Sequence, residues 1–354
     1  MHILCFESGG TKLVASLANL EGQLTETSVE ARSPGQNAED TLNQLIGMGR
    51  KILGGRAVSA IGFGFGGTVR RSDRRPTLCF HEDGWQATDA GEILANRFGV
   101  PVLIENDCKL AALAEAWQNQ PPPSGSLLYL TIGTGIGAGV VRNGYLVELG
   151  NLGEAELGHV VVEPDGVTCG CGNRGCLEAY CSGPGLESLA HQLTGSAIDP
   201  VTLMAGYLRG GRRERRIVEQ AAEYLGRVLG TAVNLFAPDQ IVLGGGVMTG
   251  NDPFLEGGVM TGNDPFLELI RDRTSPYAFP PFWSDVRQFR LSRLALRTSR
   301  VGTPDSPEGE LPASPGVQKG VGSLSVLVPA SETVERRISQ DATCLQEVPD
   351  HDPV

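Results

Sequence analysis

The sequence predicts an α/β fold built from two similar halves with a cleft between them. Each half opens with an apolar strand, a glycine turn and a second strand, at 2–7, 8–11 and 12–20 in the first half and at 127–132, 133–135 and 137–141 in the second. Helical patterns and further apolar strands follow in both halves, which is typical of α/β units. The length of 354 residues is enough for two domains.

In the first half, a third strand is expected near 23–30, after the Glu21-Gly22 turn. A helix is predicted from apolar residues that fall on one face, and Gly54 ends it; these residues are Leu42, Leu45, Ile46, Ile52 and Leu53. Two more strands are predicted at 58–65 and 100–105, and the second of them leads into a helix at about 108–118.

The second half begins after residues 120–125, whose composition (Gln-Pro-Pro-Pro-Ser-Gly) is that of a linker. We therefore expect an N-terminal domain at 1–118 and a C-terminal domain at 119–296. One face of a long helix is apolar through Ile217, Ala221, Tyr224, Val228 and Leu235. A strand at 240–243 then runs into the glycines 244–246.

Two features near the end of the chain are unusual. Residues 245–256 recur without change at 257–268, and two copies of so short a unit cannot stack as a structural repeat. We interpret the copy as a recent duplication in the gene. Residues 297–354 are rich in Pro, Ser, Gly and Glu and lack periodicity, which predicts an atypical, mostly disordered tail.

The net charge of -12 and the pI of about 5.0 argue against nucleic acid as the main partner, because an acidic surface repels a phosphate backbone. The first residues lack a basic n-region, and no apolar run approaches the roughly 20 residues that span a bilayer. We therefore expect a cytoplasmic protein without a membrane partner. Its 8 cysteines should be reduced thiols or metal ligands.

A metal site is predicted from His159, Cys169, Cys171 and Cys176, which follow the pattern H-x9-C-x-C-x4-C. Three thiolates and one imidazole form a complete tetrahedral set for Zn²⁺, with no position left for water. Such a closed site is structural, and it would hold a loop rigid beside a binding site. The alternative is that these are four unrelated buried residues.

The two glycine turns are candidate phosphate sites. Gly9, Gly10, Thr11 and Lys12 place glycines, a hydroxyl and a cation between two strands, where backbone N–H groups can bind an anion. Gly133, Thr134 and Gly135 place glycines and a hydroxyl in the corresponding turn of the second half. A tight hairpin is the alternative in both places. A dinucleotide fingerprint is set aside, because 139–141 continue as a strand where that fingerprint needs a helix.

A candidate general base lies in the sequence Glu105-Asn106-Asp107, at the end of a strand and just before a helix. Strand ends of an α/β sheet converge on a crevice, and phosphoryl transfer needs one carboxylate there to accept a hydroxyl proton. Asp107 is suited to that role. The alternative is that Asn106 or Asp107 only caps the helix.

Together these motifs resemble the ROK (repressor, open reading frame, kinase) sugar kinases, most of all their bacterial glucokinases. The resemblance rests on five segments in the same order, over roughly 2–294: Glu-Ser-Gly-Gly-Thr-Lys at 7–12, Glu-Asn-Asp at 105–107, Gly-Thr-Gly-Ile-Gly at 133–137, Glu-x-Gly-His at 156–159 and Cys-x-Cys-Gly-x-x-Gly-Cys-Leu-Glu at 169–178. It implies a ribonuclease-H-like fold of the actin/hexokinase type that closes over its substrate.

The resemblance also implies an ATP-dependent hexokinase of the glucokinase type. Asp107 would deprotonate the sugar 6-hydroxyl, while the other sugar contacts would come from Gly67, Asn106, Glu156, His159 and Glu178. The glycines of both turns would bind ATP phosphates, and Gly244 and Gly245 would lie near the adenosine. Mg²⁺ would be a further cofactor, and relatives of this kind are commonly homodimers or homotetramers.

The chain departs from the family pattern in three places. Glu7 stands where Asp is frequent; it keeps a carboxylate for the Mg²⁺ shell but also occurs in relatives that act on fructose. The duplication follows Gly244-Gly245-Gly246, and the usual closing helix is missing after Ala295. The cysteine cluster and the Cys-Leu-Glu sequence at 176–178 still favour glucose or an N-acetylated hexosamine. Glucose is the first expectation, with an N-acetylmannosamine or N-acetylglucosamine kinase and a fructokinase as alternatives.

Two hypotheses from other functional classes remain. The altered C-terminus suggests a catalytically impaired relative, and the family also contains sugar-responsive transcription regulators. The regulator needs an N-terminal winged helix-turn-helix, for which a strand that begins at His2 leaves no room.

Overall fold

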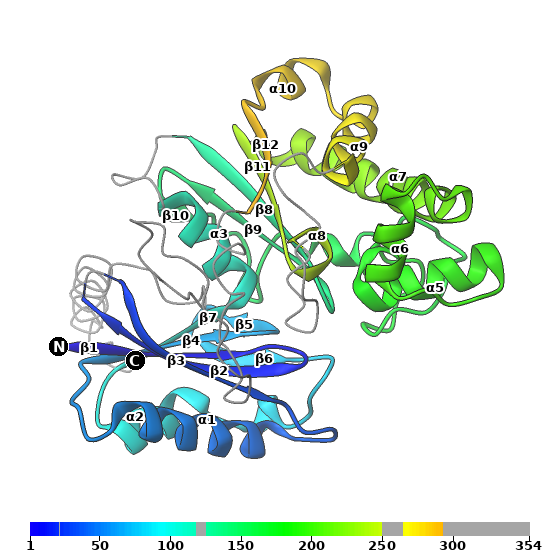
Figure 1. Ribbon diagram of the computed structural model, residues 1–354. Coiled ribbons are helices and arrows are strands. Elements are labelled where there is room, and N and C mark those ends of the chain that lie inside the picture. Colours follow the sequence, from blue (N-terminus) through cyan, green and yellow to red (C-terminus); the bar gives the residue numbers. More distant parts are fainter. Residues whose placement is uncertain (21, 118–124, 250–264, 293–354) are drawn as a thin grey trace, which may run out of the picture.

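A computed structural model describes residues 1–20, 22–117, 125–249 and 265–292. It contains two five-stranded mixed sheets, which lie in separate halves of the molecule (Figure 1). The first sheet has the order β3-β2-β1-β4-β7 and is formed by β1 (His2–Ser8), β2 (Lys12–Asn19), β3 (Leu24–Ala31), β4 (Ala60–Phe65) and β7 (Val102–Asn106). The second has the order β10-β9-β8-β11-β12 and is formed by β8 (Ser126–Ile132), β9 (Ile136–Arg142), β10 (Tyr145–Leu146), β11 (Gln240–Gly244) and β12 (Gln288–Leu291).

The two sheets have the same topology. In each, the first strand pairs antiparallel with the second, the second pairs antiparallel with the third, and two later strands add in parallel on the other side. Phe6 of β1 pairs with Ala15 on one side and Phe63 on the other. The predicted duplicated α/β fold is therefore confirmed.

Helices cover the sheets as their apolar faces require. In the first half these are α1 (Ala38–Leu53), which runs from an Asn37 capping box to the left-handed Gly54, and α2 (Ala90–Phe98). The predicted face of α1 is buried, with Leu42 and Leu45 at 2% and 0% exposure. A hairpin of β5 (Thr68–Arg70) and β6 (Arg75–Leu78) and the short η1 (Trp85–Ala87) complete this half. These elements and α2 were not predicted from the sequence.

The second half contains the longest helix, α7 (Arg212–Phe236), whose residues Ile217, Ala221 and Val228 are fully or almost fully buried. Leu235 was wrongly assigned to this face: it is 70% exposed, while Val233 and Phe236 in the same turn pack in or against the core. The other helical segments here are η2 (Leu157–His159), α4 (Glu178–Cys181), α5 (Gly183–Thr194), α6 (Pro200–Leu208), α8 (Gly246–Thr249), α9 (Pro265–Thr274), η3 (Ser275–Tyr277) and α10 (Pro280–Asp285).

Helix α3 (Asp107–Trp117) follows β7 of the first sheet, yet its alanine-rich face packs on the second sheet, with Leu127, Tyr129 and Val141. Glycines in β9 permit this close approach. A β-carbon on Gly139 would lie 2.7 Å from the β-carbon of Ala112 and 3.0 Å from Cα of Lys109. Because α3 joins the two halves, Asp107 at its start is held at the junction.

Several predictions fall wholly or partly outside the described residues. The linker at 120–125 has only Gly125 described, the tail at 297–354 has no described residue, and the domain boundary stays a prediction. Of the duplicated segment, the first copy supplies Val247 and Met248 to the core and the second supplies Phe266 and Leu267. Over the described parts of the chain, no helix combines the length and apolarity that a membrane crossing requires.

Candidate functional site

A cavity of about 350 Å³ lies between the two halves, a volume suited to a small-molecule ligand. It is lined by the ends of strands from both sheets and by the start of α3. The residues of the predicted site that line it are Gly9, Gly10, Thr11, Lys12, Gly67, Asn106, Asp107, Gly133, Thr134, Gly135, Glu156, His159, Glu178 and Gly245.

Gly244 is the predicted contact that does not line the cavity. It is buried at the end of β11, where a β-carbon would overlap the Tyr129 hydroxyl. Glycine is therefore needed at this position for packing against Tyr129. Gly245 next to it does line the cavity and adopts a φ of +87°, a conformation that favours glycine.

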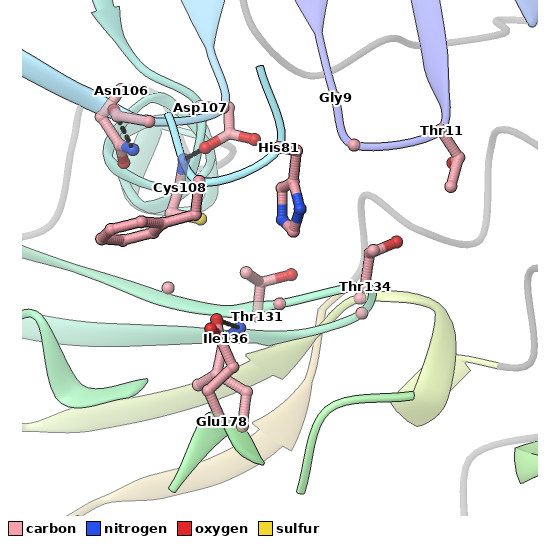
Figure 2. Close-up of a pocket in the computed structure, with 18 of the residues that line it drawn as sticks. Gly9, Thr11, His81, Asn106, Asp107, Cys108, Thr131, Thr134, Ile136 and Glu178 are labelled. Carbon is pink, nitrogen blue, oxygen red and sulfur yellow. Dashed lines mark hydrogen bonds between the residues drawn. The ribbon is translucent and has the colours of Figure 1, made fainter. Parts of the chain in front are cut away.

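Asp107 lies at the junction of β7 and α3, with its carboxylate directed into the cavity (Figure 2). The capping alternative applies to its neighbour: Asn106 Oδ1 accepts the Lys109 N–H at 3.1 Å, and Asn106 Nδ2 donates to the Gly67 carbonyl at 3.0 Å. Asp107 Oδ1 accepts the Cys108 N–H at 2.8 Å. Asn106 thus ends the strand and starts the helix, while Asp107 faces the cleft.

The surroundings of Asp107 raise its pKa to about 7. Burial is the main cause, because a carboxylate loses hydration there, and the negative charge of Glu7 adds to it. A carboxyl group with this pKa exchanges its proton near neutral pH, which is the property that a general base needs.

Glycines 66 and 67 hold the β4 end against this carboxylate. A β-carbon on Gly66 would lie 2.6 Å from the Ser8 carbonyl oxygen and 3.6 Å from both Asp107 Oδ2 and Gly9 Cα. Asp107 therefore lies beside the first glycine turn. Backbone packs here too tightly for any side chain, so the position of the turn relative to Asp107 is fixed.

The two glycine turns meet across the cavity. A β-carbon on Gly10 would lie 3.3 Å from Thr134 Cγ2, although Gly10 belongs to the first half and Thr134 to the second. Within the turns, the Gly9 N–H donates to the Lys12 carbonyl at 3.1 Å and the Gly133 N–H donates to the Gly135 carbonyl at 2.9 Å. Both turns are thus tight hairpins that also line the cavity, so the two interpretations of them are compatible.

Glu178 connects the second glycine turn to the cysteine loop. Its Oε2 accepts the Ile136 N–H at 2.8 Å (Figure 2), and its Oε1 lies 3.8 Å from Cys169 Sγ. Glu156 lies in the same part of the cavity, where burial raises its pKa and the charges of His159 and Lys109 oppose that rise. The two carboxylates and His159 present several hydrogen-bonding groups to one side of the cavity.

The cysteine cluster has the geometry of a tetrahedral metal site. One ligand atom from each of His159, Cys169, Cys171 and Cys176 lies within 4.8 Å of all the others. Cys171 Sγ is 3.7 Å from Cys176 Sγ, and Cys169 Sγ is 3.8 Å from His159 Nδ1. Zinc–sulfur bonds of about 2.3 Å at tetrahedral angles place two sulfurs about 3.8 Å apart. The four residues therefore fit Zn²⁺.

The loop that carries these cysteines depends on Gly175, which has a φ of +74°. A β-carbon there would overlap the Glu163 carbonyl, so the close return of the loop requires glycine. Two isolated bridges, Val161 with Cys176 and Thr168 with Arg174, tie the loop together. The loop thus brings three sulfurs to one side of His159, which itself lines the cavity.

The segment 78–82, which was not predicted from the sequence, places Phe80 and His81 in the cavity. Phe80 contacts the His159 ring edge to face, with the ring centroids 5.5 Å apart. This segment has no glycine motif and no periodicity, so the sequence offers no local signal for it. The fold brings it to the cleft because β6 ends there.

A network of ion pairs also joins the halves, outside the cavity. Arg71, in the turn between β5 and β6, contacts Glu154 Oε2 at 2.6 Å and Glu148 Oε2 at 3.5 Å. Glu154 Oε1 lies 3.0 Å from Nζ of the buried Lys109 in α3. These contacts hold the loop that precedes Glu156 against the first half.

Comparison with known proteins places this site in a family. The family model described as "ROK family" matches residues 3–302. The chain belongs to the ROK family. It is 29% identical over 261 residues to a glucokinase from Thermotoga maritima, which covers 70% of this chain and 82% of that protein.

Solved structures of other ROK proteins share the fold. A ROK hexokinase from Thermus thermophilus is 30% identical with a TM-score of 0.67, covering 83% of this chain and 93% of that one. A ROK glucokinase from Streptomyces griseus, in complex with glucose and AMPPNP, is 25% identical with a TM-score of 0.64, covering 82% and 94%. This ROK protein therefore has the ribonuclease-H-like, actin/hexokinase-type fold, and these relatives are sugar kinases.

Proposed function

We propose that this ROK protein transfers the γ-phosphoryl group of ATP to the 6-hydroxyl of a hexose, with glucose as the preferred substrate. Relatives that are glucokinases and hexokinases support the reaction class. The observation that carries the proposal is Asp107, a carboxyl group with a pKa of about 7 that faces a cavity between two glycine turns.

In the proposed step, Asp107 accepts the proton of the sugar hydroxyl as that oxygen bonds to the γ-phosphorus. The bond between the γ-phosphorus and the bridging oxygen of ADP breaks at the same time, and ADP leaves with the electron pair. Proton acceptance requires the ionised carboxylate, so activity should rise as the pH rises through about 7.

The sugar is proposed to lie beside Asp107, against Gly67, Asn106, Glu156, His159 and Glu178. Carboxylates and the imidazole can accept hydrogen bonds from sugar hydroxyls, and the remaining N–H of Asn106 can donate one. The contact of Asn106 Nδ2 with the Gly67 carbonyl supports a joint role for these two residues, because it fixes both at the cavity wall.

The nucleotide phosphates are proposed to bind the turns that contain Gly9–Lys12 and Gly133–Gly135, with the adenosine toward Gly245. Backbone N–H groups of such turns can bind phosphate oxygens. Mg²⁺, held through the carboxylate of Glu7, would neutralise charge on the phosphates.

The His159 and cysteine cluster is proposed to bind a structural Zn²⁺. The Nδ1 atom of His159 lies toward the sulfurs, which leaves Nε2 available to a sugar hydroxyl. The metal would then fix the ring orientation without taking part in the chemical step.

A coupled assay with ATP, Mg²⁺ and a panel of hexoses tests the proposal. Glucose, mannose, fructose, N-acetylglucosamine and N-acetylmannosamine distinguish the kinase alternatives. The proposal fails if purified, zinc-loaded protein phosphorylates none of them. That result would favour the impaired relative or the regulator, which differ in whether the protein binds an operator-like DNA fragment.

A further inference from the structure

His81 lies in the cavity between the proposed phosphate turns and Asp107 (Figure 2). Its place is fixed by its neighbour Glu82, which is only 6% exposed. The Glu82 carboxylate accepts the Trp85 Nε1–H at 2.6 Å and also binds Arg32 and Thr41. Glu82 therefore anchors the chain in the first-half core, while His81 is exposed to the cleft.

The ring of His81 lies where the two glycine turns meet. A β-carbon on Gly10 would be 3.6 Å from His81 Cδ2 and 3.3 Å from Thr134 Cγ2. The residue that precedes it, Phe80, contacts His159 on the sugar side. Adjacent residues of one segment thus reach the sugar side and the phosphate side of the same cavity.

The charges around the cavity indicate that His81 can interact with phosphate. Among the described residues that line it, four are acidic and three are basic: Glu7, Asp107, Glu156 and Glu178 against Lys12, His81 and His159. His159 faces the cysteine sulfurs, so Lys12 and His81 are the side chains left to offset phosphate charge. In phosphoryl transfer, that charge is spread over the three equatorial oxygens of the transferred group.

We infer that His81 donates a ring N–H to an oxygen of the phosphoryl group in transit, and so acts as a further catalytic residue. The inference rests on the proposed function, because the group must pass from the glycine turns to the hydroxyl beside Asp107. A donor placed at developing charge stabilises the transition state more than the ground state. Loss of His81 should therefore lower kcat and leave sugar binding unchanged.

The test compares His81→Phe, which keeps the ring shape but has no N–H, with His81→Gln, which keeps a donor. His191→Gln, an exposed histidine on α5, is the matched control. Steady-state kinetics give kcat and KM, and calorimetry gives the affinities for glucose, for ADP and for a non-hydrolysable ATP analogue. Because His81 is exposed, both variants should melt at the wild-type temperature.

We expect His81→Phe to lower kcat about 100-fold, His81→Gln to recover at least tenfold of that loss, and His191→Gln to match wild type. The phenylalanine variant should also bind the ATP analogue more weakly while its ADP and glucose affinities hold. The inference is overturned if the wild type is active and His81→Phe keeps its kcat, or if the variant loses glucose affinity. If the wild type phosphorylates no hexose, the proposed function is refuted instead. The affinities of wild type and His81→Phe for the ATP analogue and for ADP then test His81 alone: a loss for the analogue only supports a contact with the γ-phosphoryl group, and unchanged affinities refute it.

Discussion

Replacing Asp107 by Asn should make the fold more stable at alkaline pH, even though it removes the proposed base. Burial and Glu7 raise the pKa of Asp107 from an ordinary 3.8 to about 7 in the folded protein. The folded state therefore holds this proton more tightly than the unfolded chain does. Stability is lost as the pH rises from about 4 to about 7, because the unfolded chain ionises first.

The magnitude follows from the two pKa values. A tenfold change in an equilibrium corresponds to about 1.4 kcal/mol, so the full effect above pH 7 is about 4 kcal/mol. Part of that loss is already present at pH 5. Between pH 5 and pH 8, the free energy of unfolding of the wild type should therefore fall by about 3 kcal/mol more than that of Asp107→Asn. The asparagine can still accept the Cys108 N–H, which limits other effects.

Guanidinium denaturation of both proteins at pH 5 and pH 8 measures this difference, and comparing the two proteins at each pH cancels the contribution of the other groups. Asp199→Asn is the control, because Asp199 caps α6 and its hydrogen bond with Thr202 lowers its pKa. That carboxyl is ionised in both states across this pH range, so its replacement should have the same effect at both pH values. An equal effect of Asp107→Asn at pH 5 and pH 8 would refute the raised pKa.

Three further outcomes follow from the contacts. Cys176→Ser should weaken zinc binding at least tenfold and reduce glucose affinity, measured by metal analysis and calorimetry; full metal content would contradict the four-ligand site. Arg71→Ala should raise KM and lower kcat together, about tenfold, because Arg71 ties the Glu154 loop to the first half; unchanged kinetics would exclude this role. Gly139→Ala should destabilise the fold by about 1–3 kcal/mol, because the new β-carbon would press on α3. Gly47→Ala in α1 has open space around it and should stabilise the fold by up to about 1 kcal/mol. Thermal melting compares the two variants, and equal shifts in melting temperature would contradict the packing of α3 on β9.

The duplicated α/β fold could be predicted because each half repeats the same local signals. Apolar strands and glycine turns are adjacent in sequence, so the pairings of β1 with β2 and of β8 with β9 follow from the pattern. The packing of α3 on the second sheet could not be predicted. It depends on Gly137 and Gly139 of β9, and nothing in the sequence of that strand indicates that a helix of the other half packs against them.

The candidate site could be predicted where its residues share a compact motif. The cysteine cluster is local, within 18 residues, and the structure brings all four residues together. His81 and Phe80 carry no motif, and they reach the cavity because Glu82 and Trp85 are anchored in the core. Gly244 matched a glycine run but packs against Tyr129, so a glycine pattern alone does not separate ligand contact from packing.

The most direct test of the central proposal is turnover of glucose by wild type and Asp107→Asn at pH 8, with glucose affinity measured on the same samples. The proposal predicts glucose 6-phosphate and ADP from the wild type. For Asp107→Asn it predicts a loss of kcat of about 100-fold to 10,000-fold, with glucose affinity unchanged within a few fold. Equal turnover by the two proteins would contradict the role of Asp107 as the base.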